Sequence, residues 1–123
     1  MEILMKPIIY LFYLSFIIFI VFFKSTYAGS NVQFLNGEKL LEICRDSKEV
    51  NQAACEGYIL GIQDAINSGH LEKHLNLCFP KGVSPKDLRL NLINFIEVMP
   101  QTAKFSGESV VAKSLELYYK CKS

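Results

Sequence analysis

The residues best suited to chemistry in this 123-residue chain are two histidines and four cysteines. His70 and His74 stand four positions apart with Glu72 between them, so on a helix both imidazoles would share one face and could hold a metal ion. A specific site needs a third ligand, and the sequence marks none. We therefore favour two solvent-facing histidines in a connecting segment over a metal site, and we expect no metal and no other cofactor.

Catalysis would require more than these residues. A nucleophile needs a base within reach and a third group that orients the base. The chain has no Gly-x-Ser-x-Gly, phosphate-loop or His-Glu-x-x-His motif. If all the cysteines form disulfides, none remains as a nucleophile. The sequence therefore predicts a protein without catalytic residues rather than an enzyme.

The spacing of Cys44, Cys55, Cys78 and Cys121 favours disulfides over metal binding or redox chemistry. No pair has the Cys-x2-Cys or Cys-x4-Cys spacing of structural zinc or thioredoxin-like sites. An even number of cysteines in a short exported chain indicates a disulfide framework. Spacing alone does not choose among the alternative pairings.

The first 28 residues, 1–28, have the composition of a secretory signal peptide, because 21 of them are apolar. Thr26 and Ala28 are small residues at the −3 and −1 positions of a cleavage site after residue 28. The central apolar run of 17 residues, interrupted only by Ser15, is at the lower limit for a membrane-spanning helix. A retained anchor at the membrane is therefore the alternative to cleavage. Both interpretations deliver residues 29–123 to the far side of a membrane.

The segment 29–123 has the size of one small domain. It carries 11 basic and 11 acidic residues, a balance that gives no support for binding nucleic acid. Apolar residues make up 50% of the whole chain and charged residues 20%, values that exclude a disordered tail or a coiled coil. A domain of this length buries only a modest core, so disulfides would add to its stability.

Apolar residues at three- and four-residue spacing predict amphipathic helices in this domain. Asn36 is a suitable N-cap for the first helix, and Ser84 with Asp87 makes a near capping box before the third. Strand-like alternation is lacking and the connections are short, which predicts an all-α fold, a small disulfide-stapled bundle of about four helices. The expected helix ranges are 37–46, 50–67, 85–98 and 107–120.

Gly57 and Gly61 lie four residues apart inside the second predicted helix, where each costs about 1 kcal/mol relative to alanine. We expect these glycines to let another helix of the bundle approach closely. A homodimer contact on the same face is the alternative.

Two blocks of the sequence together resemble the Rap/Tai family of immunity proteins, which protect bacteria against type VI secretion effectors. The first block is Cys-Glu-Gly-Tyr-Ile-Leu-Gly-Ile-Gln-Asp at 55–64, and the second is Cys-Phe-Pro-Lys-Gly-Val at 78–83. The similarity runs from about residue 34 to residue 121. The chain departs from the family pattern at Lys120, where proline is expected, and at Asp87, where glutamine is common.

The resemblance implies a periplasmic, all-helical protein that binds a cognate toxin, typically a peptidoglycan amidase, and blocks its active site. It implies disulfides between Cys44 and Cys55 and between Cys78 and Cys121. Some relatives are dimers, so a homodimer is a further expectation. The alternative is a periplasmic structural or chaperone-like protein with no toxin partner, whose signature would be exposed apolar surface. Three leucines that fall outside the main apolar stripes could form it: Leu60, Leu90 and Leu117.

As an inhibitor, a rigid bundle would present a segment that occupies the cleft of an effector hydrolase. Two polar segments that join helices, 67–77 and 100–107, are the candidates, because such connections often carry binding residues. The predicted partner-contact residues are Asn67, Ser68, His70, Glu72, Lys73 and His74.

Overall fold

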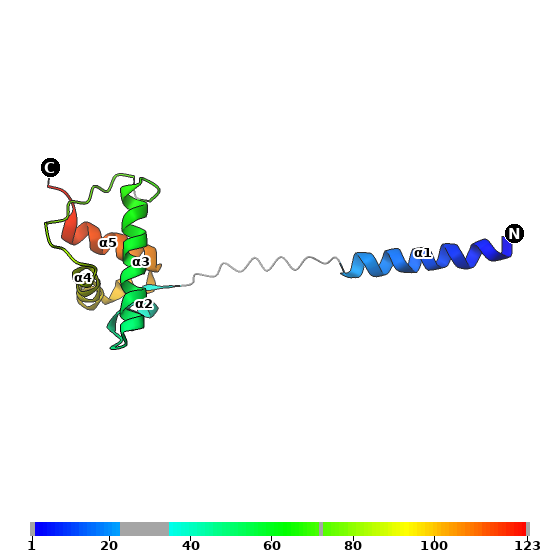
Figure 1. Cartoon of the computed structure of the whole chain (residues 1–123), viewed down its shortest axis with the longest axis horizontal. Coiled ribbons are helices and arrows are strands. Elements are labelled where there is room, and N and C mark those ends of the chain that lie inside the picture. The colour runs from blue at the N-terminus through cyan, green and yellow to red at the C-terminus, as the bar shows by residue number, and fades with distance from the viewer. Residues whose placement is uncertain (1, 23–34, 72, 123) are drawn as a thin grey trace. The chain divides into compact units, whose positions relative to one another are not determined.

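The computed structural model describes residues 2–22, 35–71 and 73–122 and divides the chain into two units, Met1–Val32 and Gln33–Ser123. The first unit contains one described helix, α1 (Glu2–Phe22). The second unit contains α2 (Gly37–Arg45), α3 (Glu49–Asn67), α4 (Pro85–Val98), the 3-10 helix η1 (Pro100–Lys104) and α5 (Gly107–Tyr119). Figure 1 labels the α-helices. The described residues form no strand, and the predicted all-α, disulfide-stapled bundle is confirmed.

Short polar side chains cap the N-terminal ends of α2, α4 and α5. Asn36 accepts a hydrogen bond from the backbone N–H of Lys39 at 2.9 Å. Ser84 and Asp87 form a complete capping box before α4, in which the Asp87 carboxylate accepts from the Ser84 backbone N–H at 2.8 Å. Ser106 caps α5 with its side chain. Such a cap contributes about 1 kcal/mol and acts locally, so the predicted helix bounds fall within one residue of those observed.

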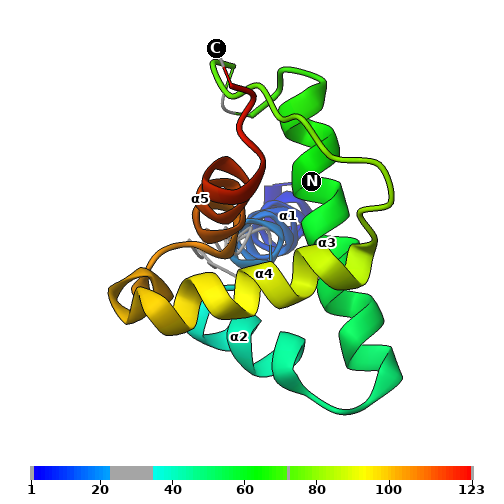
Figure 2. The same ribbon diagram turned by 90° about the vertical axis from the view of Figure 1, so that its left-hand side faces the viewer.

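The core lies where α2, α3, α4 and α5 meet. In Figure 2, α4 crosses the bundle between α5 above and α2 below, and each of the other helices contacts it. Buried aliphatic side chains fill the space between them, and each contributes about 1.5–3 kcal/mol through the apolar area it removes from water. The central residues, each at most 2% exposed, are Leu40, Ile59, Leu92, Ile96 and Val110.

Two disulfides staple this bundle, with the pairing that the family resemblance implies. Cys44 and Cys55 are buried, and their bond joins the end of α2 to α3. Cys78 is exposed, and its bond to Cys121 holds the C-terminal end of the chain against the segment between α3 and α4. Backbone hydrogen bonds on both sides of this second disulfide reinforce the contact.

The expectation that Gly57 and Gly61 permit a helix crossing is wrong. Both glycines are exposed, and a Cβ atom added at either would have no heavy atom within 4 Å. The close approaches occur at Gly37 and Gly107, where an added Cβ would lie 2.9 Å from a neighbouring atom. Spacing within a helix shows which residues share a face, but it does not show which other element covers that face.

The connection between α4 and α5 is more regular than the sequence predicts. Pro100 begins η1, and the backbone N–H of Thr102 donates to the Met99 carbonyl at 2.9 Å. The Thr102 hydroxyl donates to the same carbonyl at 2.7 Å. Segment 100–107 is therefore an ordered surface element rather than an irregular loop.

Candidate partner-binding surface

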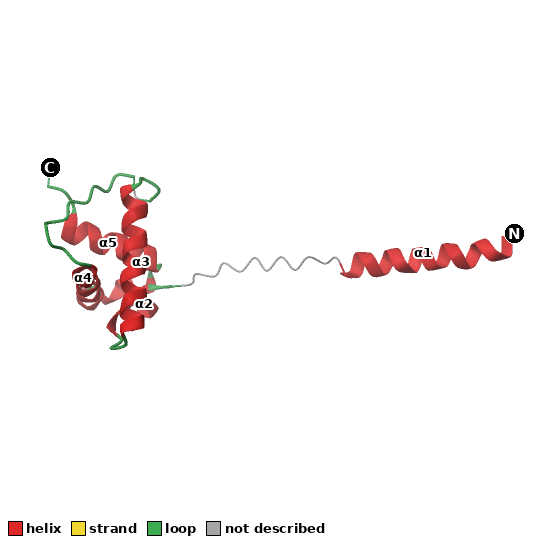
Figure 3. Ribbon diagram, viewed as in Figure 1, coloured by secondary structure: helices red, strands yellow, loops and turns green. Residues whose placement is uncertain are grey.

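The predicted partner-contact residues lie at the end of α3 and in the loop that follows it, drawn green in Figure 3. The described ones are Asn67, the last residue of α3, its C-cap Ser68, and then His70, Lys73 and His74. All five are exposed, which is compatible with partner contact. Glu72 lies outside the described residues. Their role in binding stays a prediction.

The histidines do not form a reactive pair in this arrangement. The Ser68 hydroxyl lies 2.8 Å from Nδ1 of His70, and it donates to the Ala65 carbonyl at 3.1 Å. Which of the two groups donates depends on the tautomer of His70, and the Ala65 carbonyl offers the hydroxyl proton a second acceptor. The contact closes the helix-terminating turn at Gly69, whose φ is 75°. Across the described ranges, no three His, Cys, Asp or Glu side chains gather closely enough to hold a metal ion.

His74 is brought against α5, a helix far away in the sequence. With Leu75 it borders a polar hollow of about 240 Å³. The facing wall belongs to α5 and consists of Ser109, Ala112, Lys113 and Glu116, with Lys120 just beyond the helix end. Lys120 pairs with Glu116 at 3.3 Å, whereas Lys113 takes part in none of the ion pairs of the described residues.

Asn67 and Lys73 line a different hollow, of about 420 Å³, beside the end of α3. Cys121 borders it too, so the Cys78–Cys121 disulfide holds this hollow together. The structure therefore separates the predicted contact residues: His74 lies beside α5, and Asn67 and Lys73 lie beside the exposed disulfide.

The second predicted segment, 100–107, borders a third hollow, of about 470 Å³, which is mainly apolar. Phe105 is 46% exposed and Leu117 of α5 is 60% exposed, so this is open apolar surface rather than core. The apolar residues that line the hollow are Phe95, Met99, Phe105 and Leu117.

Lys113 and Glu116 line both the polar and the apolar hollow, so α5 joins the two predicted segments into one surface. Sequence reasoning did not predict that α5 would join the two segments, although Leu117, which falls outside the apolar stripe of its helix, was a signal of exposed surface there. We name the set the α5 surface. Its polar side consists of His74, Lys113, Glu116 and Lys120, and its apolar side of Met99, Phe105 and Leu117.

Charge is distributed unevenly although the domain as a whole is balanced. Residues 33–66 carry six acidic and three basic side chains, whereas residues 67–123 carry five acidic and eight basic ones. A hollow on α2 is bordered by Glu38, Glu42 and Asp46. The charged residues that border the α5 surface, apart from His74, are two lysines, Lys113 and Lys120, and one glutamate, Glu116.

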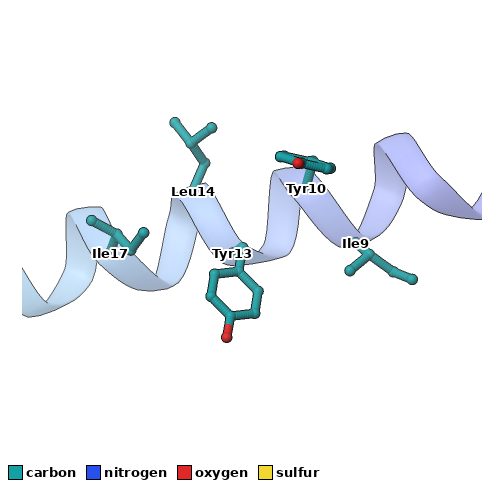
Figure 4. A pocket seen from close by; sticks show the side chains of 5 residues that line it. All are labelled: Ile9, Tyr10, Tyr13, Leu14 and Ile17. Carbon is teal, nitrogen blue, oxygen red and sulfur yellow. The ribbon is translucent and has the colours of Figure 1, made fainter.

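A hollow on α1 offers no comparable site. Figure 4 shows the five side chains around it, and all of them come from this one helix: Ile9, Tyr10, Tyr13, Leu14 and Ile17. Within the part of the chain that the structure describes, no helix combines the length and apolar character needed to cross a membrane.

Together these features define a small, disulfide-stapled helical domain with open surface suited to binding another protein. Residues 36–121 match the family of Rap1a immunity proteins. The chain belongs to this family, which confirms the resemblance seen in the sequence and gives it an immunity function linked to type VI secretion. No curated protein and no solved structure matches the chain.

Proposed function

We propose that this immunity protein acts in the periplasm, where it binds a cognate type VI effector hydrolase, a peptidoglycan amidase, and blocks its active site. Family membership supplies the general immunity function. The observation that carries the more specific proposal is the α5 surface, an open apolar hollow next to a polar, basic one. An apolar centre bordered by polar residues is typical of protein–protein interfaces.

Two features support a periplasmic location. The domain contains two disulfides, and such bonds persist in oxidising compartments rather than in the cytosol. Residues 1–28 have the composition of a signal peptide, so their proposed role is export. Contact with a membrane would remain only if this segment is retained as an anchor.

The proposed inhibition is steric and needs no catalytic residue. A buried core and two disulfides hold the domain in one shape, so little conformational freedom is lost when it binds. A rigid surface seated over the hydrolase cleft would exclude the peptidoglycan substrate.

The alternative function, a structural or chaperone-like protein, predicts exposed apolar surface at Leu60, Leu90 and Leu117. Leu60 packs against the core, whereas Leu90 is 47% exposed. Leu117 is exposed as well, but it lies within the α5 surface, where an effector would cover it. We therefore favour effector binding over a general structural role.

Co-purification tests this proposal. The full chain, with its own leader, is expressed together with a tagged peptidoglycan hydrolase encoded beside it, and the hydrolase is purified from the periplasm. We expect a stable complex in which the chain begins after residue 28, as measured by mass spectrometry. An unrelated periplasmic hydrolase serves as the control. Recovery of the cognate hydrolase without this chain would contradict the proposal.

A further inference from the structure

We propose that the effector docks on the α5 surface and presents there a carboxylate beside a large apolar side chain. This inference rests on the proposed function and deepens it by naming the partner group that the α5 surface would select. It replaces a single binding loop by a surface centred on α5.

The apolar side of the surface supplies an anchoring site. Phe105 and Leu117 are large, exposed side chains around a hollow whose inner wall includes Phe95, itself 4% exposed. A hollow of about 470 Å³ is large enough for an apolar side chain of a partner. Most of the binding energy of an interface comes from a few large side chains that fill such pockets.

The polar side of the α5 surface supplies a positive charge, which favours a carboxylate on the partner. Lys113 borders both hollows and forms none of the ion pairs found among the described residues. Glu116, the acidic residue beside it, is already paired with Lys120. A carboxylate placed next to the apolar anchor would reach Lys113, and the covered apolar surface would shield this ion pair from water.

Two other hollows of the domain, one on α2 and one beside Cys121, do not combine these two properties. The hollow on α2 is bordered by three acidic residues, Glu38, Glu42 and Asp46, against one cation, Arg45. Arg45 already pairs with Glu97, so the charge of this hollow disfavours the same carboxylate. The hollow beside Cys121 has a lysine, Lys73, but is lined mostly by polar and small groups rather than by exposed aromatic side chains. The α5 surface, by contrast, places the exposed ring of Phe105 and Lys113, which is unpaired among the described residues, around one hollow.

Matched substitutions in the full chain test the inference. Lys113→Glu reverses the central charge, and Leu117→Ala removes the exposed apolar side chain. The controls are Lys48→Glu and Val50→Ala, which make comparable changes at exposed positions near the start of α3. Affinity for the purified neighbouring hydrolase is measured by titration, and folding of each variant by circular dichroism.

We expect each α5-surface variant to raise Kd by about 10–100-fold and each control to change it by less than about twofold. The association rate of the unsubstituted chain should fall as salt is added, and that of Lys113→Glu should depend less on salt. Exchange of an acidic residue of the hydrolase for lysine should restore binding to Lys113→Glu. Phe105→Ala provides a second apolar variant if Leu117→Ala is poorly folded.

Three results would overturn the inference in distinguishable ways. If the unsubstituted chain binds but the α5-surface variants bind equally well, the surface is wrong and the proposed function stands. If the unsubstituted chain does not bind, the proposed function fails and the inference fails with it. If the variants disrupt only self-association, measured by light scattering, a second copy of the chain occupies the surface instead.

Discussion

The Nη1 atom of Arg89 donates a hydrogen bond to the backbone carbonyl of Cys44 at 3.1 Å. Arg89 belongs to α4 and is only 7% exposed, and Cys44 lies in the last turn of α2. The Nε atom of the same side chain pairs with the carboxylate of Glu56 on α3 at 2.9 Å. One buried arginine therefore connects three helices next to the Cys44–Cys55 disulfide.

Arg89→Ala should lower the free energy of unfolding by about 3 kcal/mol, because Glu56 and the Cys44 carbonyl would lose their partner in a largely buried environment. Urea denaturation followed by circular dichroism measures the loss. Arg45→Ala is the matched control, since Arg45 pairs with Glu97 at the surface, where such pairs contribute at most about 1 kcal/mol. Equal losses in the two variants would contradict the role assigned to Arg89.

Alanine at the glycine positions should have opposite effects. Gly37→Ala should destabilise the domain, because its Cβ would lie 2.9 Å from the Cα of Ala103 in η1. Gly57→Ala and Gly61→Ala should each raise the free energy of unfolding by about 0.5–1 kcal/mol, since both are exposed positions inside a helix with open space around them. Thermal denaturation of the three variants tests this order. A loss of stability in Gly57→Ala or Gly61→Ala would show that these positions are covered after all.

Features of this fold that depend on neighbouring residues could be predicted from the sequence, whereas features that depend on contacts between distant residues could not. Helix bounds depend on nearby residues such as Asn36 and Ser84, so the residues around each helix end were enough to predict them. The disulfide pairing required the family resemblance. Arg89 sits beside Leu88 in the sequence with no local sign that its partner is 45 positions away. The α5 surface likewise depends on His74 and Phe105 meeting one helix, which spacing does not reveal.

The two disulfides should be reduced in a fixed order. Attack on a disulfide requires access to its sulfur atoms, and Cys78 is exposed whereas Cys44 and Cys55 are each at most 1% exposed. We expect increasing dithiothreitol to open Cys78–Cys121 before Cys44–Cys55. Alkylation at each concentration followed by peptide mass spectrometry identifies the free cysteines. In guanidinium chloride, where the fold is lost, the difference should disappear; earlier opening of Cys44–Cys55 would contradict the prediction.

Stability should fall in acid partly because of the capping box at α4. Hydrogen bonds from the side chain and the backbone N–H of Ser84 hold the pKa of Asp87 below its ordinary value of 3.8. Below that pH the unfolded chain takes up a proton that the folded chain still lacks, so the free energy of unfolding falls as the pH falls. Urea denaturation between neutral pH and the acid range measures this slope. Ser84→Ala should make it shallower, and an unchanged slope would remove the capping box as the cause.

The most direct test of the proposed inhibition is a peptidoglycan-cleavage assay with the purified neighbouring hydrolase. The chain, produced from its full-length gene, is titrated into a fixed amount of hydrolase, and released peptidoglycan fragments are measured. A steric inhibitor that binds tightly should reduce cleavage in proportion to the amount added and abolish it at equal molar amounts. Full cleavage in the presence of excess folded, disulfide-bonded chain would contradict the proposal.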